Sequence, residues 1–135
     1  MDNLQKEKFS GLLDRFHSFY DGVIRSWHFF FGLPGEGLKF QVVISTRDKS
    51  TTDNNGWANV VFEIEQVSEY RLQDRPKHRH QVLSNGIHFG EYDGNIFIDV
   101  GSLLDDPDGL EEFRTSEWYV AGRLLNYDVK AYSAT

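Results

Sequence analysis

Apolar and polar positions along the chain follow two different periods. Between residues 3 and 20, apolar side chains recur at helical spacing and form one stripe, which predicts an amphipathic helix. Asp2 or Asn3 can cap the start of this helix, and Gly22 can end it. From residue 22 to residue 132 the pattern mostly alternates, which predicts β-strands. The stripe consists of Phe9, Leu12, Leu13, Phe16 and Tyr20.

Three strands are predicted before residue 70. The segment 22–32 is rich in β-branched and aromatic residues, and the segments 38–47 and 57–66 alternate between apolar and polar positions. The alternation of the third strand breaks at Val67 and resumes at Tyr70 and Leu72. Such a break in parity predicts an irregularity near residues 66–68, of the kind that a β-bulge introduces.

The segment 86–100 predicts a β-hairpin with a defined register. Asp93-Gly94 is typical of a two-residue type I′ turn. Counting outward from this turn places His88 opposite Asp99. The register is self-consistent, because it brings four apolar side chains to the same face of the hairpin. These are Ile87, Phe89, Ile98 and Val100.

The remaining segments complete a mainly β (α+β) prediction. Residues 103–113 predict a turn region with one helical turn, and residues 117–132 predict one or two closing strands. We expect a single domain over residues 1–135, with a helix at 3–20 and antiparallel β-structure at 22–132. The expected architecture is a curved antiparallel sheet of six to eight strands, or a partly open barrel, with the helix packed on it. A two-sheet β-sandwich is the alternative.

Composition and motifs indicate the cellular compartment and the need for cofactors. The chain of 135 residues contains no cysteine, so a reducing compartment is favoured. The polar N-terminus shows no secretory signal, and no apolar run reaches the length of a membrane span. The sequence therefore predicts a cytoplasmic protein. No phosphate loop, dinucleotide fingerprint or zinc motif is present, so we expect no cofactor.

Charge is concentrated in one segment. The formal net charge is −7, and residues 99–117 hold seven acidic side chains and only one basic side chain, that of Arg114. Such a field repels nucleic acids and anionic membranes and attracts basic partners. A solvated loop that keeps the protein in solution is the simpler interpretation. The candidate partner-binding residues are Asp105, Asp106, Asp108, Glu111 and Glu112.

Histidines provide the weaker candidates for chemistry. His78 and His80 lie in RPKHRH (75–80), with the spacing of some metal-ligand pairs. Three cations surround them, so we interpret the segment as an exposed loop without a metal. The predicted His88–Asp99 pair could orient a general base, as in a small hydrolase, or could be a cross-strand polar pair on a solvent face. No nucleophile motif accompanies this pair.

Two segments carry a resemblance to known families. FYDGVI (19–24) opens a strand and WANVVFEIEQVSEYRL (57–72) continues the sheet, and this order over residues 16–130 resembles small bacterial all-β families. Some of these families are immunity proteins of polymorphic toxin systems. They typically carry a His-Asp pair where this chain has Tyr20-Asp21. The resemblance implies a non-catalytic binding protein.

The sequence thus leaves three functional hypotheses. The leading one is a non-catalytic, immunity-like protein that binds a basic protein partner through its acidic segment. The first alternative is a β-barrel that binds a small molecule in a cavity lined by phenylalanines. The second alternative is a small hydrolase that uses His88 and Asp99. The sequence supports no prediction of the oligomeric state.

Overall fold

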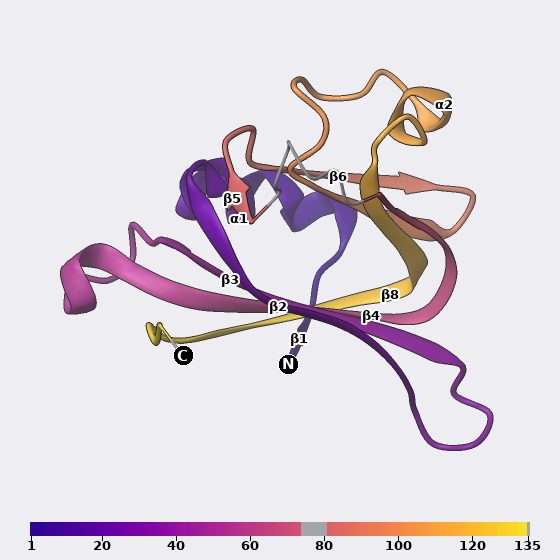
Figure 1. The fold of residues 1–135 in the computed structure, drawn as a ribbon, viewed down its shortest axis with the longest axis horizontal. Coiled ribbons are helices and arrows are strands. Elements are labelled where there is room, and N and C mark those ends of the chain that lie inside the picture. Colours follow the sequence, from indigo (N-terminus) through magenta and orange to yellow (C-terminus); the bar gives the residue numbers. More distant parts are fainter. Residues whose placement is uncertain (74–80, 135) are drawn as a thin grey trace.

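A computed structural model describes residues 1–73 and 81–134, and its main feature is one curved antiparallel sheet (Figure 1). The sheet has eight strands in the order β5-β2-β3-β4-β8-β7-β6, and β1 pairs with β8 beside this path. The bounds are β1 Asp2–Asn3, β2 Gly22–Phe31, β3 Leu38–Arg47, β4 Trp57–Leu72, β5 Val82–Leu83, β6 Ile87–Tyr92, β7 Asn95–Val100 and β8 Trp118–Ala131. The helices are α1 Phe9–Arg15 and α2 Leu110–Phe113, and 3-10 turns span Lys6–Lys8, His17–Phe19 and Asp53–Gly56.

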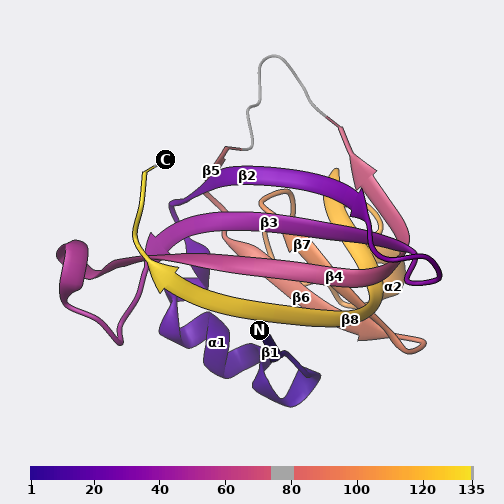
Figure 2. The same ribbon diagram turned by 90° about the horizontal axis from the view of Figure 1, so that it is seen from below.

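The mainly β prediction is confirmed, including the form of a nearly closed barrel with a helix packed on it. Strands β2, β3, β4 and β8 form one layer, and α1, β6 and β7 lie across from it (Figures 1 and 2). One continuous hydrogen-bonded path joins the two layers, so the two-sheet sandwich is not the fold. The strands predicted at 22–32 and 38–47 correspond closely to β2 and β3.

Rings fill the space between the two layers. Phe19 lies against Phe62 with ring centroids 5.6 Å apart, and Phe62 lies 5.7 Å from Phe89. Phe9 of α1 stacks on Phe89 at 4.9 Å. The helix, β4 and β6 therefore share one aromatic core, whose burial is the main driving force for this fold.

The helix is shorter than its apolar stripe predicted. Asp2–Asn3 pairs with β8, and the N–H of Leu4 donates to the carbonyl of Leu125 at 2.8 Å, so the start of the chain is extended. At the other end, the three residues from His17 to Phe19 have positive φ angles of 54° to 61°. An L-residue helix cannot continue through left-handed backbone, so α1 ends at Arg15. Tyr20, predicted to be in the apolar stripe, is 52% exposed instead.

A bulge bends the two longest strands, as the parity break at Val67 predicted. The β4–β8 register shifts between Val67 and Glu69, and Gln66 has a φ of 54°. Gly122 of β8 lies opposite this bulge. A Cβ atom at Gly122 would lie only 2.5 Å from Cγ2 of Ile64 and 2.7 Å from the carbonyl oxygen of Glu65. The close approach of the two backbones at the bend therefore requires glycine.

The hairpin prediction is confirmed residue by residue. All six predicted pairs between β6 and β7 are present, from Ile87 opposite Val100 to Tyr92 opposite Asn95. Asp93 and Gly94 have φ angles of 53° and 79°, as a type I′ turn requires. The predicted closing segment forms one strand, β8, and the predicted helical turn is α2.

We predict that Gly122→Ala lowers the free energy of unfolding by about 1–3 kcal/mol, because the added methyl group overpacks the bend. Urea denaturation followed by circular dichroism measures this change. The matched control is Gly11→Ala on the exposed face of α1, where an added Cβ meets nothing within 4 Å. Alanine there should stabilise the protein by about 0.5–1 kcal/mol, because it favours the helix. Equal effects of both substitutions would contradict the role given to Gly122.

Candidate functional site

The candidate site is built on one buried carboxylate, that of Asp99. Asp99 lies on β7 with no exposed surface, and its Oδ2 atom lies 2.9 Å from Nδ1 of His88 on β6. The predicted pairing of these residues is confirmed by the register. The expectation of a solvent-facing pair is wrong, because His88 is only 6% exposed. The segment between β7 and β8 covers this face of the hairpin, which the hairpin sequence alone could not indicate.

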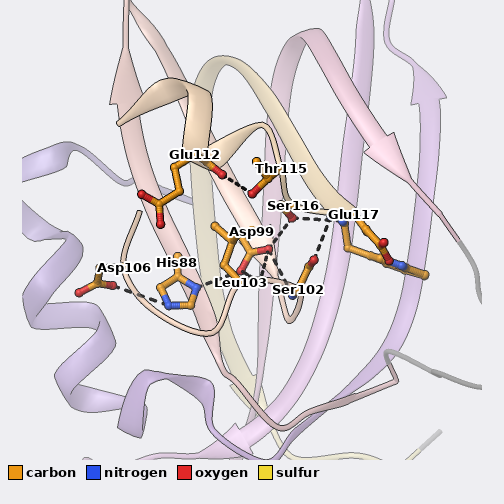
Figure 3. A network of polar contacts seen from close by, with 10 residues as sticks. His88, Asp99, Ser102, Leu103, Asp106, Glu112, Thr115, Ser116 and Glu117 are labelled. Carbon is orange, nitrogen blue, oxygen red and sulfur yellow. Dashed lines mark hydrogen bonds and ion pairs between the residues drawn. The ribbon is translucent and has the colours of Figure 1, made fainter. Parts of the chain in front are cut away.

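Asp99 also holds both ends of the segment that covers it. The hydroxyl of Ser116 donates to Oδ1 at 2.5 Å, and the backbone N–H groups of Ser102 and Leu103 donate to the carboxylate at 3.2–3.3 Å. Figure 3 shows these bonds converging on Asp99 from two directions. We call residues 101–116 the anchored loop. Its two ends are fixed through one side chain.

A second layer of hydrogen bonds joins the ends of the anchored loop to each other. The hydroxyl of Ser102 accepts from the N–H of Glu117 at 2.9 Å (Figure 3). The hydroxyl of Ser116 accepts from the N–H of Trp118 at 3.1 Å. Buried polar groups must be paired to avoid a large desolvation cost. The Ser102–Glu117 bond joins the start of the anchored loop to the residue that follows its end, whereas the Ser116–Trp118 bond lies within the second end.

The far part of the anchored loop is attached independently through α2. Phe113 is fully buried against Phe97, with ring centroids 5.4 Å apart. Arg114 donates to both carboxylate oxygens of Glu69 on β4, at 3.0 and 2.8 Å. The hydroxyl of Tyr119 donates to the same carboxylate at 2.9 Å. This bidentate pair ties α2 to the central strand β4.

Electrostatics at this attachment favour the charged form of Glu69. The hydrogen bonds from Arg114 and Tyr119 lower the pKa of Glu69 against the opposing effect of its burial. Burial, followed by the hydrogen bond to Glu69, raises the pKa of Tyr119 to about 12. Glu69 is therefore a carboxylate at neutral pH and Tyr119 keeps its proton, which is the pairing that the geometry requires.

The five predicted partner-binding residues all lie on the anchored loop and are exposed. Asp106 is almost fully exposed at 96%, and its Oδ1 atom lies 3.7 Å from Nε2 of His88 (Figure 3). Glu112 accepts a hydrogen bond from the N–H of Asp108 at 2.9 Å. Apart from the Asp106–His88 contact, none of the five forms an ion pair with a described residue. The loop therefore presents its negative charge to solvent.

The geometry does not place Ser116 as the nucleophile of the hydrolase hypothesis. In a triad, the nucleophilic hydroxyl lies at the histidine nitrogen that is not bound to the aspartate. Here Ser116 is bound to Asp99 rather than to His88, and it has no exposed surface. The free nitrogen of His88 faces the carboxylate of Asp106. These groups are arranged to hold a loop in place.

The other predicted site residues fall outside this cluster. His78 and His80 lie outside the described residues. Over residues 1–73 and 81–134, no group of three or more possible metal ligands occurs. In the same ranges, no helix is long and apolar enough to cross a bilayer. The fully buried phenylalanines pack ring against ring, so they give no support to an open cavity that they would line.

Sequence reasoning missed several contributors to the site, among them Ser102, Ser116 and Arg114. The hydroxyl of Ser116 lies 17 positions from its partner Asp99, and Arg114 lies 45 positions from Glu69. No periodic pattern connects residues across such intervals. The Gly101-Ser102 step, which follows Asp99 after Val100, was the local signal of a turn that folds back on the strand.

No protein-family model, curated protein or solved structure matches the chain. The resemblance to immunity-protein families therefore stays a prediction from the sequence pattern. The geometry of the anchored loop carries the functional argument on its own.

We predict that Asp99→Asn lowers the free energy of unfolding by about 3 kcal/mol or more, because it replaces a buried charged acceptor with an amide that leaves donors unpaired. Urea denaturation measures the loss. Amide hydrogen exchange at Ser102 and Leu103 should quicken in the same variant. Asp106→Asn is the matched control and should change stability by less than about 0.5 kcal/mol, because exposed charge pairs contribute little. If Asp99→Asn leaves the free energy of unfolding unchanged, Asp99 does not hold the site together.

We predict that Glu69→Gln flattens the dependence of stability on pH in the acid range. An unfolded glutamate titrates at about pH 4.3. The pKa of Glu69 is lowered in the folded protein, so its contribution is present above the unfolded pKa and lost as the pH falls through the folded pKa. Urea midpoints between about pH 7 and pH 3 measure this loss. Glu111→Gln on the exposed loop is the control and should leave the profile unchanged.

Proposed function

We propose that this chain is a non-catalytic, immunity-like binding protein whose anchored loop docks on a basic protein partner. One observation carries the proposal: five exposed carboxylates lie on a loop whose two ends are fixed by the buried side chain of Asp99. A loop that only kept the protein in solution would need neither a buried aspartate nor two serines to hold its shape.

Fixing the loop lowers the cost of binding. A flexible loop loses conformational freedom when it meets a partner, and that loss subtracts from the affinity. The anchored loop has already lost much of this freedom on folding, through Asp99 at its ends and Phe113 in α2. Its carboxylates therefore present a fixed pattern of charge, which favours one orientation of the partner.

The loop also offers an apolar contact, which favours a protein partner. Leu104 is 74% exposed and directly precedes Asp105 and Asp106. Protein interfaces commonly combine an apolar centre with a polar and charged rim. Nucleic acids would be repelled by the same carboxylates. An exposed leucine within an acidic surface thus fits a basic protein that carries an apolar pocket.

We predict that neutralising three loop carboxylates slows association with the partner. The variant is Asp105→Asn, Asp108→Asn and Glu111→Gln, which spares the contacts of Asp106 and Glu112. The association rate constant should fall about tenfold or more at low salt, because long-range attraction is lost. At 0.5 M salt the effect should largely vanish, because the Debye length is then about 4 Å. Surface plasmon resonance measures these rates with a partner isolated from the native host.

The matched control removes the same charge elsewhere on the surface. Glu7→Gln, Asp53→Asn and Glu91→Gln change three exposed carboxylates outside the anchored loop. This control should change the association rate much less than the loop variant does. A partner that binds both variants equally fast would show that net charge, and not the anchored loop, governs encounter. A rate that ignores salt in all variants would contradict the proposal.

A further inference from the structure

A second bulge, in β2, directs the side chain of Arg25 out of the regular pattern. In the β2–β3 register, Ile24 pairs with Ile44 and Ser26 pairs with Val43, so Arg25 is the extra residue between two paired positions. Bulges of this kind redirect a side chain and are frequent beside binding sites. The residue redirected here is a half-buried arginine.

The guanidinium of Arg25 is held by neutral groups. Its Nε atom donates to the hydroxyl of Ser45 at 2.9 Å, and Nη2 donates to the hydroxyl of Tyr132 at 3.3 Å. Ser45 is fully buried and donates in turn to the side-chain oxygen of Asn59 at 2.6 Å. Among the described residues, no carboxylate forms an ion pair with Arg25. Within residues 1–73 and 81–134, the positive charge is therefore oriented but not neutralised.

These two bonds occupy one edge of the planar guanidinium. Nε and Nη2 form the side-on edge, and both donate to hydroxyl groups. The end-on edge, formed by Nη1 and the second hydrogen of Nη2, donates to no other residue in the part of the chain that the structure describes. An arginine edge of this shape binds a carboxylate through two parallel hydrogen bonds. A partly desolvated cation gains most from such a partner, because an unpaired charge is costly away from water.

The arginine lines a pocket with aromatic and amide walls. The pocket has a volume of about 260 Å³, close to the lower end of the range for small-ligand sites. The rings of Trp57 and Tyr132 lie 6.1 Å apart, and the guanidinium of Arg25 lies 5.9 Å from the Tyr132 ring. Trp57 also lines an adjoining pocket of about 230 Å³. The lining residues of the first pocket are Val23, Arg25, Asn54, Asn55, Trp57 and Tyr132.

The walls are fixed by contacts from two other segments. Beyond β8, the chain turns across the ends of β4 and β3 toward β2 (Figure 2), where the side-chain amide of Asn59 donates to the carbonyl of Ser133 at 3.0 Å. On the other side, the N–H of Asp48 donates to the carbonyl of Gly56 at 2.8 Å and closes the loop that carries Asn54 and Asn55. The pocket is thus preformed by β2, this loop and the end of the chain.

We propose that this pocket binds a small aromatic carboxylate. The end-on edge of Arg25 takes the carboxylate, the Trp57 ring and the Val23 side chain contact the planar apolar body, and the amides of Asn54 and Asn55 border the polar rim. The site lies outside the anchored loop and shares no residue with it. The inference is independent of the proposed function, because it uses a different part of the sheet and the opposite sign of charge.

The test uses sodium benzoate as the probe, at constant ionic strength. Titration of the ¹⁵N-labelled protein should shift the indole N–H signal of Trp57 with saturation, and Trp57→Phe identifies that signal. Benzamide, which has the same shape without the charge, should bind at least about tenfold more weakly, because charge-assisted hydrogen bonds are lost. Inorganic phosphate should bind more weakly than benzoate, because it leaves the aromatic wall uncovered.

Variants locate the site. Arg25→Gln should weaken benzoate binding at least about tenfold, whereas Arg123→Gln on β8 removes the same charge elsewhere and should leave binding unchanged. Because Arg25 also supports Ser45 and Tyr132, Asn55→Asp provides a second variant. It places a carboxylate at the exposed rim, at a position whose φ of 60° aspartate tolerates. The affinity for benzoate should fall severalfold, because the two negative charges repel each other.

Several outcomes would overturn the inference. Shifts that do not saturate, or equal affinities for benzoate and benzamide, would exclude a carboxylate site. If phosphate bound as tightly as benzoate, the aromatic wall would contribute nothing to affinity, and a site for aromatic carboxylates would be excluded. If a folded Arg25→Gln protein kept its affinity for benzoate, the probe would bind at another site. If Arg25→Gln did not fold, unchanged affinity in Asn55→Asp would lead to the same conclusion.

Discussion

A single buried negative charge organises one side of this molecule. The carboxylate of Asp99 has no access to water, so it must receive hydrogen bonds from protein groups to be tolerated. It receives them from the neighbouring strand through His88 and from both ends of the anchored loop. Because a buried carboxylate without donors is costly, the need for these hydrogen bonds determines where the loop lies. Loosening any of these donors exposes or unpairs the carboxylate, so the strand pair and the loop are stabilised together.

Much of the sheet could be predicted from local patterns, because each signal lies within a few residues of the structure that it specifies. The turn at Asp93-Gly94 determines the β6–β7 register, and the parity break at Val67 marks the bulge in β4. The bulge at Arg25 left no such mark, because apolar and aromatic residues occupy both faces of 22–32. The helix was overestimated because its stripe continues to Tyr20, past residues 17–19, whose backbone is left-handed.

The candidate site was predictable only in part, for a related reason. Counting from the turn placed His88 opposite Asp99, but parity specifies a face of the sheet and not whether that face is covered. Burial of the pair depends on Ser116 and on α2, which arrive from later in the chain. Exposure of the acidic side chains, by contrast, followed directly from their composition. Long-range contacts therefore account for most of what the sequence analysis missed.

The place of β8 within the sheet has a consequence for biosynthesis. β8 pairs with β4, β7 and β1, yet it follows every other described strand in the chain. Until β8 has left the ribosome, β4 and β7 each have an open edge that cannot be satisfied within the nascent chain. Contacts between residues so distant in sequence also form slowly, because a long loop must close first. Nascent chains that end before β8 thus present exposed strand edges of the kind that invite aggregation.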